Sequence, residues 1–437
     1  MQKRKYLLIV LVFLSFLFLI TSPSFGNGFI IGEQDAEAMG GASAFAARAN
    51  NPSAIFYNPA GISQLDGINV TLGTNLITVK TIYHKPGDGD KSATKDRVDT
   101  PSYFYLTGKI NESLSAGFGV YSPYGLASDW QSNWPGRNIV TYAMLRTFFF
   151  NPVIAWKPVK NLSIAAGAIA VYSDVVLNSR IVYEKMAEAQ GLKIIPPGAL
   201  SGVEGHTKLT GDGEGAGFNL GVLCNITDDL RLGVSYRSPV RVKYSGKAEF
   251  RHANSNIHPI VAIVNASTID SWAKTKITMP AQLLAGISYN ALKDFTLEFD
   301  LDWREWSSFD ALRISFKDNR MNTIKIRERW KDTITYRAGL EYRLNDALAL
   351  RAGYAYDPSA IKNRYLDPLV PDADKHAVTL GAGYKFGNWK LDISNMALFF
   401  ETASTHSSRV GFNNMFRFNA KYNTFANITS LSVSYKF

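Results

Sequence analysis

Strict alternation of apolar and polar residues is the feature that most constrains the fold of this chain. Residues 332–342 (DTITYRAGLEY) place isoleucine, leucine, alanine and two tyrosines on one face of a strand, and threonine, arginine, glycine and glutamate on the other. Residues 347–357 (ALALRAGYAYD) and 377–386 (AVTLGAGYKF) repeat the pattern. A period of two is typical of strands with one apolar face. A β-sandwich would turn that face to a protein core, whereas a transmembrane barrel would turn it to lipid.

The lengths of the connections decide between these two architectures. Short turns at 111–113, 157–161, 227–229, 291–294, 344–346 and 387–388 alternate with long connections at about 81–101, 123–146, 184–204, 245–277, 306–330, 358–375 and 401–427. Outer-membrane barrels have short periplasmic turns and longer extracellular loops, and an even number of strands. The sequence therefore predicts an all-β fold, a 14-stranded antiparallel transmembrane β-barrel over residues 68–437 in the bacterial outer membrane.

The two ends of the chain agree with that location. Basic residues at 3–5 precede fifteen apolar or hydroxyl residues, 6–20, and then the small residues of TSPSFG, which is the pattern of a secretory signal peptide. Residues 1–26 are therefore predicted to be removed, with an uncleaved membrane anchor as the alternative. The final segment, 430–437 (SLSVSYKF), is an amphipathic strand ending in phenylalanine. It resembles the signal read by the barrel assembly machinery, an expected partner.

A segment of about forty residues, 27–67, precedes the first strand. It is rich in alanine and glycine and contains two Asn-Pro pairs, at 51–52 and 58–59. Proline restricts the residue before it and removes a backbone donor, so the segment can be neither a central strand nor a long helix. A wide barrel leaves space that its own side chains do not fill. We expect short helices that plug the lumen, with a disordered periplasmic tail as the alternative.

The same segment, 28–67 (GFIIGEQDAEAMGGASAFAARANNPSAIFYNPAGISQLDG), resembles the N-terminal plug of the FadL family of outer-membrane transporters of hydrophobic compounds. The resemblance extends through 122–137 (SPYGLASDWQSNWPGR), 302–316 (DWREWSSFDALRISF) and 342–357 (YRLNDALALRAGYAYD), in family order. It implies a third barrel strand that is interrupted, so that the wall opens sideways. Substrate would be captured outside, pass an internal apolar site, and leave laterally into the membrane.

The resemblance also implies candidate gate residues. The family motif Asn-Pro-Ala falls here at Asn58, Pro59 and Ala60, which would contact the interruption of the third strand, with a plain turn as the alternative. The interruption itself is expected at Pro123 and Gly125, because proline cannot donate to the strand ladder and glycine adopts dihedral angles closed to other residues. The alternative is that Pro123 only begins an extracellular loop.

Ligand contacts are expected to be mostly apolar. Phe29 is a candidate, since the family's N-terminal segment reaches the ligand site. Arg180, Lys325, Arg327 and Lys331 fall in regions where the family places basic residues that would hold an acid head group, although each could equally be an ordinary loop or lumen charge. The loops at 183–202 and 251–275 have apolar residues at helical spacing, which suits either a capture groove or a small core that covers the barrel mouth.

The predicted function is uptake of hydrophobic molecules, with long-chain fatty acids as the expected cargo. Aromatic hydrocarbons carried by the same mechanism, or a general diffusion porin, are the alternatives. No serine is placed beside a histidine by any recognisable motif, so an enzyme is not expected. The net charge of +10 is diffuse, which argues against nucleic acid binding. We expect no cofactor and no metal, a monomer, and outer-membrane lipids as neighbours.

Overall fold

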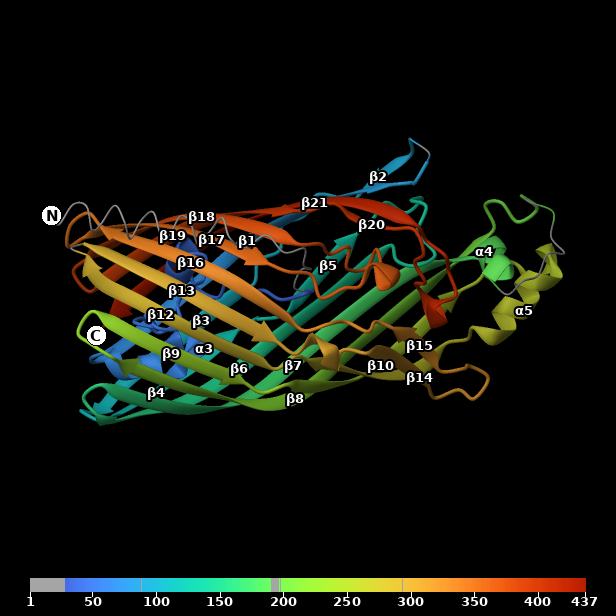
Figure 1. Ribbon diagram of the computed structural model, residues 1–437. Coiled ribbons are helices and arrows are strands. Elements are labelled where there is room, and N and C mark those ends of the chain that lie inside the picture. The colour runs from blue at the N-terminus through green and yellow to red at the C-terminus, as the bar shows by residue number, and fades with distance from the viewer. Residues whose placement is uncertain (1–27, 88, 190–195, 197, 293) are drawn as a thin grey trace.

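The computed structural model describes residues 28–437 except 88, 190–195, 197 and 293, so the predicted signal peptide lies outside the described residues. The chain forms a closed antiparallel barrel (Figure 1). The wall has fourteen strands, three of them in two pieces: β1 (Ile68–His84), β3 (Ser102–Asn111), β4 (Leu114–Tyr121) with β5 (Gly125–Asp129), β6 (Tyr142–Val159), β7 (Leu162–Val182), β8 (Glu204–Asn225), β9 (Leu230–Arg237) with β10 (Val240–Arg251), β11 (Ser271–Met279) with β12 (Gln282–Leu292), β13 (Phe295–Arg304), β16 (Thr333–Arg343), β17 (Leu348–Asp357), β18 (Lys375–Phe386), β19 (Trp389–Phe400) and β21 (Ala420–Lys436).

Closure of the barrel is made by the first and last wall strands. β1 pairs with β21 along its length, from Asn69 opposite Lys436 to His84 opposite Lys421. The predicted fourteen-stranded antiparallel barrel is therefore confirmed. No described helix is long and apolar enough to cross a membrane.

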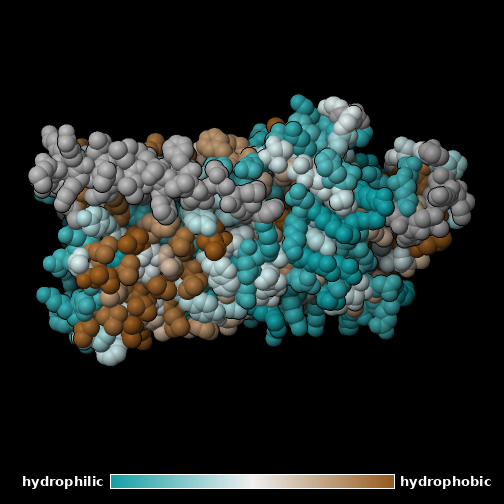
Figure 2. All heavy atoms as spheres, in the orientation of Figure 1, coloured by the Kyte–Doolittle hydropathy of each residue, from teal (hydrophilic) through white to brown (hydrophobic). Residues whose placement is uncertain are grey.

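The two faces of the wall differ as the sequence pattern predicts. Outward side chains such as Leu220, Val234 and Leu380 are apolar and exposed, whereas the charged Asp300 and Arg351 point inward and are buried. Figure 2 shows the apolar residues gathered over one half of the barrel and polar residues over the other half. An apolar outer band next to a polar lumen is the arrangement of a membrane barrel.

Several wall strands extend beyond the apolar band into regions expected to be loops. β10 continues to Arg251 and β11 begins at Ser271, so both strands extend into the connection expected at 245–277. Four short strands also lie in expected loops: β2 (Lys91–Ala93), β14 (Ala311–Phe316), β15 (Ile324–Arg327) and β20 (Ala403–Thr405). These loop predictions were wrong because backbone pairing does not require apolar side chains, and the outward residues here are polar.

Short helices occupy the barrel lumen near the short-turn end: α2 (Ala36–Gly40), α3 (Ala54–Tyr57) and η1 (Pro59–Gln64). The Asp35 side chain caps α2 by accepting a hydrogen bond from the Ala38 amide. Asn58 caps η1 in the same way, with Pro59 in the first turn, where its missing N–H costs nothing. Every residue of α2 and α3 is buried. The plug of short helices predicted for the lumen is present.

The opposite end of the barrel bears the long connections. They contain the helices α4 (Tyr183–Ala189) and α5 (Pro259–Ser267), which project beyond the barrel in Figure 1. The described parts of these connections also contain four single 3₁₀ turns: η2 (Ser255–Ile257), η3 (Trp306–Ser308), η4 (Asn363–Tyr365) and η5 (Phe412–Asn414).

Candidate functional site

The third wall strand is interrupted at residues 122–124. Before the break, β4 pairs with β3 on one side and β6 on the other. After the break, β5 keeps its pairing with β6, from Gly125 opposite Arg146 to Asp129 opposite Tyr142. On its other side β5 has no long ladder among the described residues, and single bridges such as Thr94 to Trp130 replace it. Pro123 and Gly125 thus lie at the break, as predicted from the sequence.

The N-terminal segment satisfies the backbone groups that the break releases. The Ile31 amide donates to the Pro123 carbonyl (2.9 Å), and the Gly125 amide donates to the Phe29 carbonyl (3.0 Å). The Gln34 side chain donates to the Ser122 carbonyl and accepts from the Ser122 amide. Buried backbone donors and acceptors that lose a strand partner need such replacements. Residues 29–34 therefore take the place of a strand at the edge of the wall.

The predicted contact of Asn58 with this break is not formed in the structure. The Asn58 side chain donates to the Ala46 carbonyl in the plug (2.8 Å) and to the Val222 carbonyl on β8 (2.9 Å). β8 is the sixth wall strand, so Asn58 and Pro59 fasten the plug to a different part of the wall. The sequence reading missed that the residues nearest the break are those around Phe29. A gating role for Asn58, Pro59 and Ala60 stays a prediction.

Phe29 is held in an aromatic box. Its ring centroid lies 5.0 Å from that of Trp306, 5.6 Å from Trp330, 6.0 Å from Phe309 and 6.2 Å from Tyr124. The preceding residue, Gly28, has φ +64°, and a Cβ there would lie 2.4 Å from the Trp330 ring. Offset and edge-on aromatic pairs each add to the stability gained from burial. The box fixes the N-terminal segment against the break in β4–β5.

A cavity of about 570 Å³ lies beside this segment. Its luminal lining includes Val79 on β1, whose side chain faces inward and is 38% exposed, and Ile428 on β21. The lining also includes Met144 and Phe148, which belong to the outward face of β6. The cavity therefore extends from the lumen to the outer side of the wall, at the place where β5 lacks a long ladder.

Every basic side chain that lines the cavity is already paired with a carboxylate. The separations are 2.5 to 2.9 Å in the pairs Lys95–Asp129, Arg97–Asp99, Arg146–Asp174, Arg337–Asp302 and Lys375–Asp372. The site thus combines apolar walls with cations whose charge is locally compensated. The described residues hold no group of three or more histidine, cysteine or acidic side chains arranged to bind a metal ion.

The four basic residues predicted as ligand contacts lie outside the lining of this cavity. Arg180 is on β7 beside His206, while Lys325 and Arg327 lie on β15, where their amides donate to Asn413 and Asn414. Lys331 follows Trp330, and burial lowers its pKa to about 8. The structure brings Phe29 and Gly125 to the cavity and leaves these cations elsewhere, so their binding of a head group stays a prediction.

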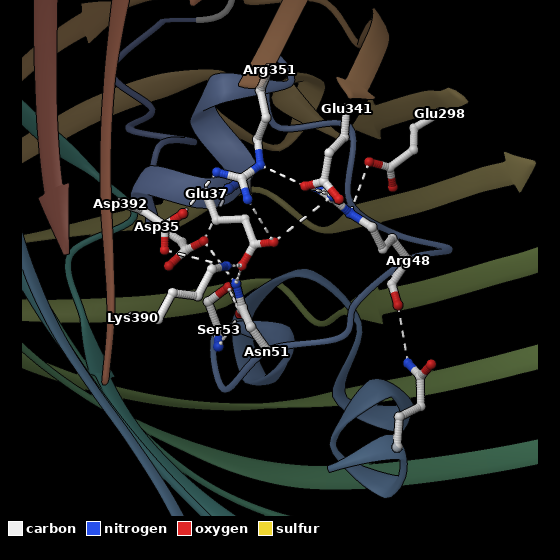
Figure 3. Close-up of polar contacts among 12 residues, drawn as sticks. Asp35, Glu37, Arg48, Asn51, Ser53, Glu298, Glu341, Arg351, Lys390 and Asp392 are labelled. Carbon is white, nitrogen blue, oxygen red and sulfur yellow. Dashed lines mark hydrogen bonds and ion pairs between the residues drawn. The ribbon is translucent and has the colours of Figure 1, made fainter. Parts of the chain in front are cut away.

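The plug is fastened to the wall by a buried ionic network (Figure 3). Arg48 of the plug contacts Glu298 (3.0 Å) and Glu341 (2.6 Å) of the wall. Arg351 of the wall contacts Glu341 (2.7 Å), Asp392 (2.7 Å) and Glu37 of the plug (3.3 Å). These side chains come from five separate segments and almost none of their surface meets water. The sequence did not predict this network, because within its own strand each of these residues looks like an ordinary charged residue facing the lumen.

Wall glycines let the plug backbone approach closely. A Cβ at Gly233 would lie 2.0 Å from the Ala46 carbonyl oxygen, and one at Gly353 would lie 2.5 Å from the Ala42 nitrogen. Asp300 adds two hydrogen bonds, accepting from the amides of Phe45 and Ala46 at 2.8 and 2.9 Å. The plug is therefore fitted to the inner wall by shape as well as by charge.

The loop helices at the outer end form a separate apolar cluster. The side chains of Tyr183 and Ala187 on or beside α4 pack with Val261 and Val264 on α5. Ile263, on the opposite face of α5, is 59% exposed, and Ile257 is also exposed. The loops thus form a small apolar core with exposed apolar residues beside it, and a capture groove at these loops stays a prediction.

A plugged, closed barrel with an apolar cavity behind an interrupted wall strand defines a transport barrel of the outer membrane. The family model described as "Outer membrane protein transport protein (OMPP1/FadL/TodX)" matches residues 17–437. The chain belongs to this family of outer-membrane transporters of hydrophobic compounds, which confirms the family and the location predicted from the sequence. The family consists of transport proteins and not of enzymes.

Relatives of the chain carry different names within this family. An outer membrane protein of Neisseria meningitidis serogroup B is 27% identical over 94% of this chain and 95% of its own length. A long-chain fatty acid transport protein of Escherichia coli K12 is 22% identical over 84% of this chain and 86% of its own.

Solved structures share the fold. A FadL homologue of Pseudomonas aeruginosa superimposes with a TM-score of 0.84 at 23% identity, covering 94% of this chain and all of that one. The P. putida toluene transporter TodX gives 0.68 at 17% identity, covering 89% of this chain and 94% of its own.

Proposed function

We propose that this protein takes up hydrophobic molecules from outside the cell, holds them in the cavity beside Phe29, and releases them sideways into the membrane between β5 and residues 94–101, which line the cavity and are hydrogen-bonded to β1. One observation carries the proposal: a single cavity is lined both by luminal residues such as Val79 and by outward residues such as Phe148. A lateral route also suits the physics of the cargo. Passing an alkyl chain through water costs about 0.8 kcal/mol for each CH₂ group, and an exit into lipid avoids that step.

The plug supports the same route, because it fills the short-turn end of the lumen. Arg48 and Glu37 of the plug form buried ion pairs with Glu341 and Arg351 of the wall there. Water and small polar solutes would meet this obstruction, whereas an apolar molecule in the cavity would meet the wall gap first.

A direct test compares two transport assays on the unmodified protein. We expect proteoliposomes that contain it to show no swelling in small sugars, and cells that express it to take up a labelled hydrophobe faster than cells that lack it. Rapid sugar entry would instead identify a diffusion porin and end the proposal of lateral transport. Cells whose uptake does not depend on the protein would contradict any role in entry of the hydrophobe tested.

The identity of the cargo is a second question. Long-chain fatty acids were expected from the sequence, and the names of relatives include both long-chain fatty acid transport and toluene transport. The paired state of the lining cations favours an uncharged cargo. A carboxylate entering this cavity would have to displace an existing acid from Arg97, Arg337 or Lys375 or remain partly desolvated without a counter-ion, which is costly.

Freeing one lining cation is expected to change this preference. The variant Asp99→Asn leaves the Arg97 guanidinium without its 2.5 Å carboxylate partner at the cavity. We expect binding of dodecanoate, measured by quenching of tryptophan fluorescence in detergent, to strengthen about threefold to tenfold relative to 1-dodecanol. Asp318→Asn is the matched control, since it frees Arg320 in an exposed loop away from the cavity. A wild-type protein that already prefers dodecanoate would contradict the uncharged cargo while leaving the transport route intact.

A further inference from the structure

Six basic side chains form a patch on the outer face of three neighbouring strands. They are Arg241, Lys243 and Lys247 on β10, Lys274 and Lys276 on β11, and Arg313 on β14. We propose that this basic patch binds the phosphate groups of the glycolipid that forms the outer leaflet of the membrane, as a site separate from the transport cavity.

The orientation of the patch follows from the alternation of its strands. On β10 the intervening residues Val242 and Tyr244 are buried in the core, and on β11 Ile277 is buried likewise. Because successive side chains of a strand point to opposite faces, the basic residues between them point outward. All six are exposed. The patch therefore faces the surroundings of the barrel and not its lumen.

The strand register brings these charges side by side. Lys243 lies directly opposite Lys276, and Ser245 lies opposite Lys274. On the next strand Ser315 is the partner of Lys274, which places Arg313 beside Lys276. Side chains directly opposite on antiparallel strands are about 5 Å apart at Cβ, and like charges there destabilise the pairing. An anion bound across the row would remove that repulsion.

The basic side chains of the patch outnumber the acidic residues next to them, which in the neighbouring ladder are Glu214 opposite Lys243 and Asp212 opposite Ser245, both on β8. Lys80, Lys109 and Arg320 each lie within 3 Å of a carboxylate. In the part of the chain that the structure describes, no ion pair within 4 Å is formed by any of the six patch residues. Lys247 instead lies 5.4 Å from the centre of the exposed Trp272 ring. The counter-charge that Glu214 and Asp212 do not supply is therefore expected to come from another molecule.

The height of the patch selects the occupant. The outward residues of β9 and β12, among them Val234 and Leu283, are apolar and exposed, so they belong to the lipid band. Tyr236 on β9 lies near the end of that band. At about 3.3 Å of rise per residue, Lys243 on β10, the second piece of the same wall strand, lies roughly 20 Å farther along. This end bears the long loops and faces outside. The patch thus lies in the polar layer of the outer leaflet, where phosphorylated sugars of the glycolipid reside.

The test uses the full-length protein in a neutral detergent, with lipid A as the probe and its dephosphorylated form as the comparison. The variant Lys243→Gln/Lys276→Gln removes the two opposed charges, and Lys160→Gln/Lys385→Gln is the matched control at the short-turn end. We expect the patch variant to lose at least about tenfold in affinity for lipid A, with the control unchanged and the dephosphorylated probe bound weakly by all proteins.

Equal affinity of the patch variant and the wild type would overturn the proposal, as would equal binding of the dephosphorylated probe. Polyphosphate that competes as well as lipid A would also overturn it, by showing that the patch recognises soluble polyanions. Heat-dependent mobility in gels checks that each variant is a folded barrel. If the first variant does not fold, Lys274→Gln/Arg313→Gln asks the same question at the neighbouring positions.

Discussion

Substituting Val79 by tryptophan is expected to reduce uptake of a hydrophobic cargo by at least about tenfold while leaving the barrel intact. Val79 points inward from β1 into the cavity, and its 38% exposure shows that space lies in front of it. A tryptophan side chain would occupy that space and remove volume that the cargo needs on its way to the gap beside β5. The loss follows from steric exclusion and requires no change in the wall. Uptake of labelled 1-dodecanol by expressing cells is the measurement.

The control for this variant is Val234→Trp. Val234 has a similar exposure of 43% but lies on the outward face of β9, in the lipid band and away from the cavity. The same change of residue on the lipid side should leave uptake within about twofold of the wild type, because tryptophan is readily accommodated at the surface of membrane barrels. Equal loss in both variants would point to impaired assembly, and full uptake by Val79→Trp would contradict passage through this cavity.

The sequence was sufficient for the wall of the barrel because the physical signals there are local. Alternation within each strand identifies the face that contacts lipid, and the regular alternation of short and long connections predicts the number of strands. The resemblance to the FadL family implied an interrupted third strand, and Pro123 and Gly125 indicated where it would fall, since one residue lacks an amide donor and the other lacks a side chain. Loop boundaries were less accurate, because β10 and β11 extend outward with polar and basic residues that carry no apolar signal.

The partners of individual residues could not be predicted in the same way. Asn58 was expected at the break, yet its hydrogen bonds are with Ala46 and with Val222 on β8. Which wall strand a plug residue meets depends on how the plug is rotated in the lumen, and no pattern within the plug encodes that rotation. The same reason hid the pairing of Arg48 in the plug with Glu298 on β13. The pairing of Arg337 with Asp302 depends instead on the register between the wall strands β13 and β16, whose residues are distant in sequence.

The ionic network gives the plug an energetic role that can be measured. Arg351 contacts Glu37, Glu341 and Asp392 at 2.7 to 3.3 Å, and its side chain is 2% exposed. Replacing it with methionine keeps much of the volume but leaves three carboxylates short of positive charge in a buried site. Breaking a buried ion pair in this one-sided way costs about 3 to 5 kcal/mol. We expect Arg351→Met to lower the free energy of unfolding by that order, measured by urea denaturation in detergent.

Loosening of the plug should also change permeability, and this connects the network to the lateral route. If the plug obstructs the lumen because Arg351 and its partners hold it, proteoliposomes with Arg351→Met should swell in small sugars, whereas wild-type proteoliposomes should not. Arg320→Met is the matched control, since its ion pair with Asp318 lies in an exposed loop and contributes little to stability. A variant that is destabilised yet impermeable would show that shape contacts, such as those at Gly233, suffice to keep the plug in place. Unchanged stability and permeability would show that the network does not fasten the plug.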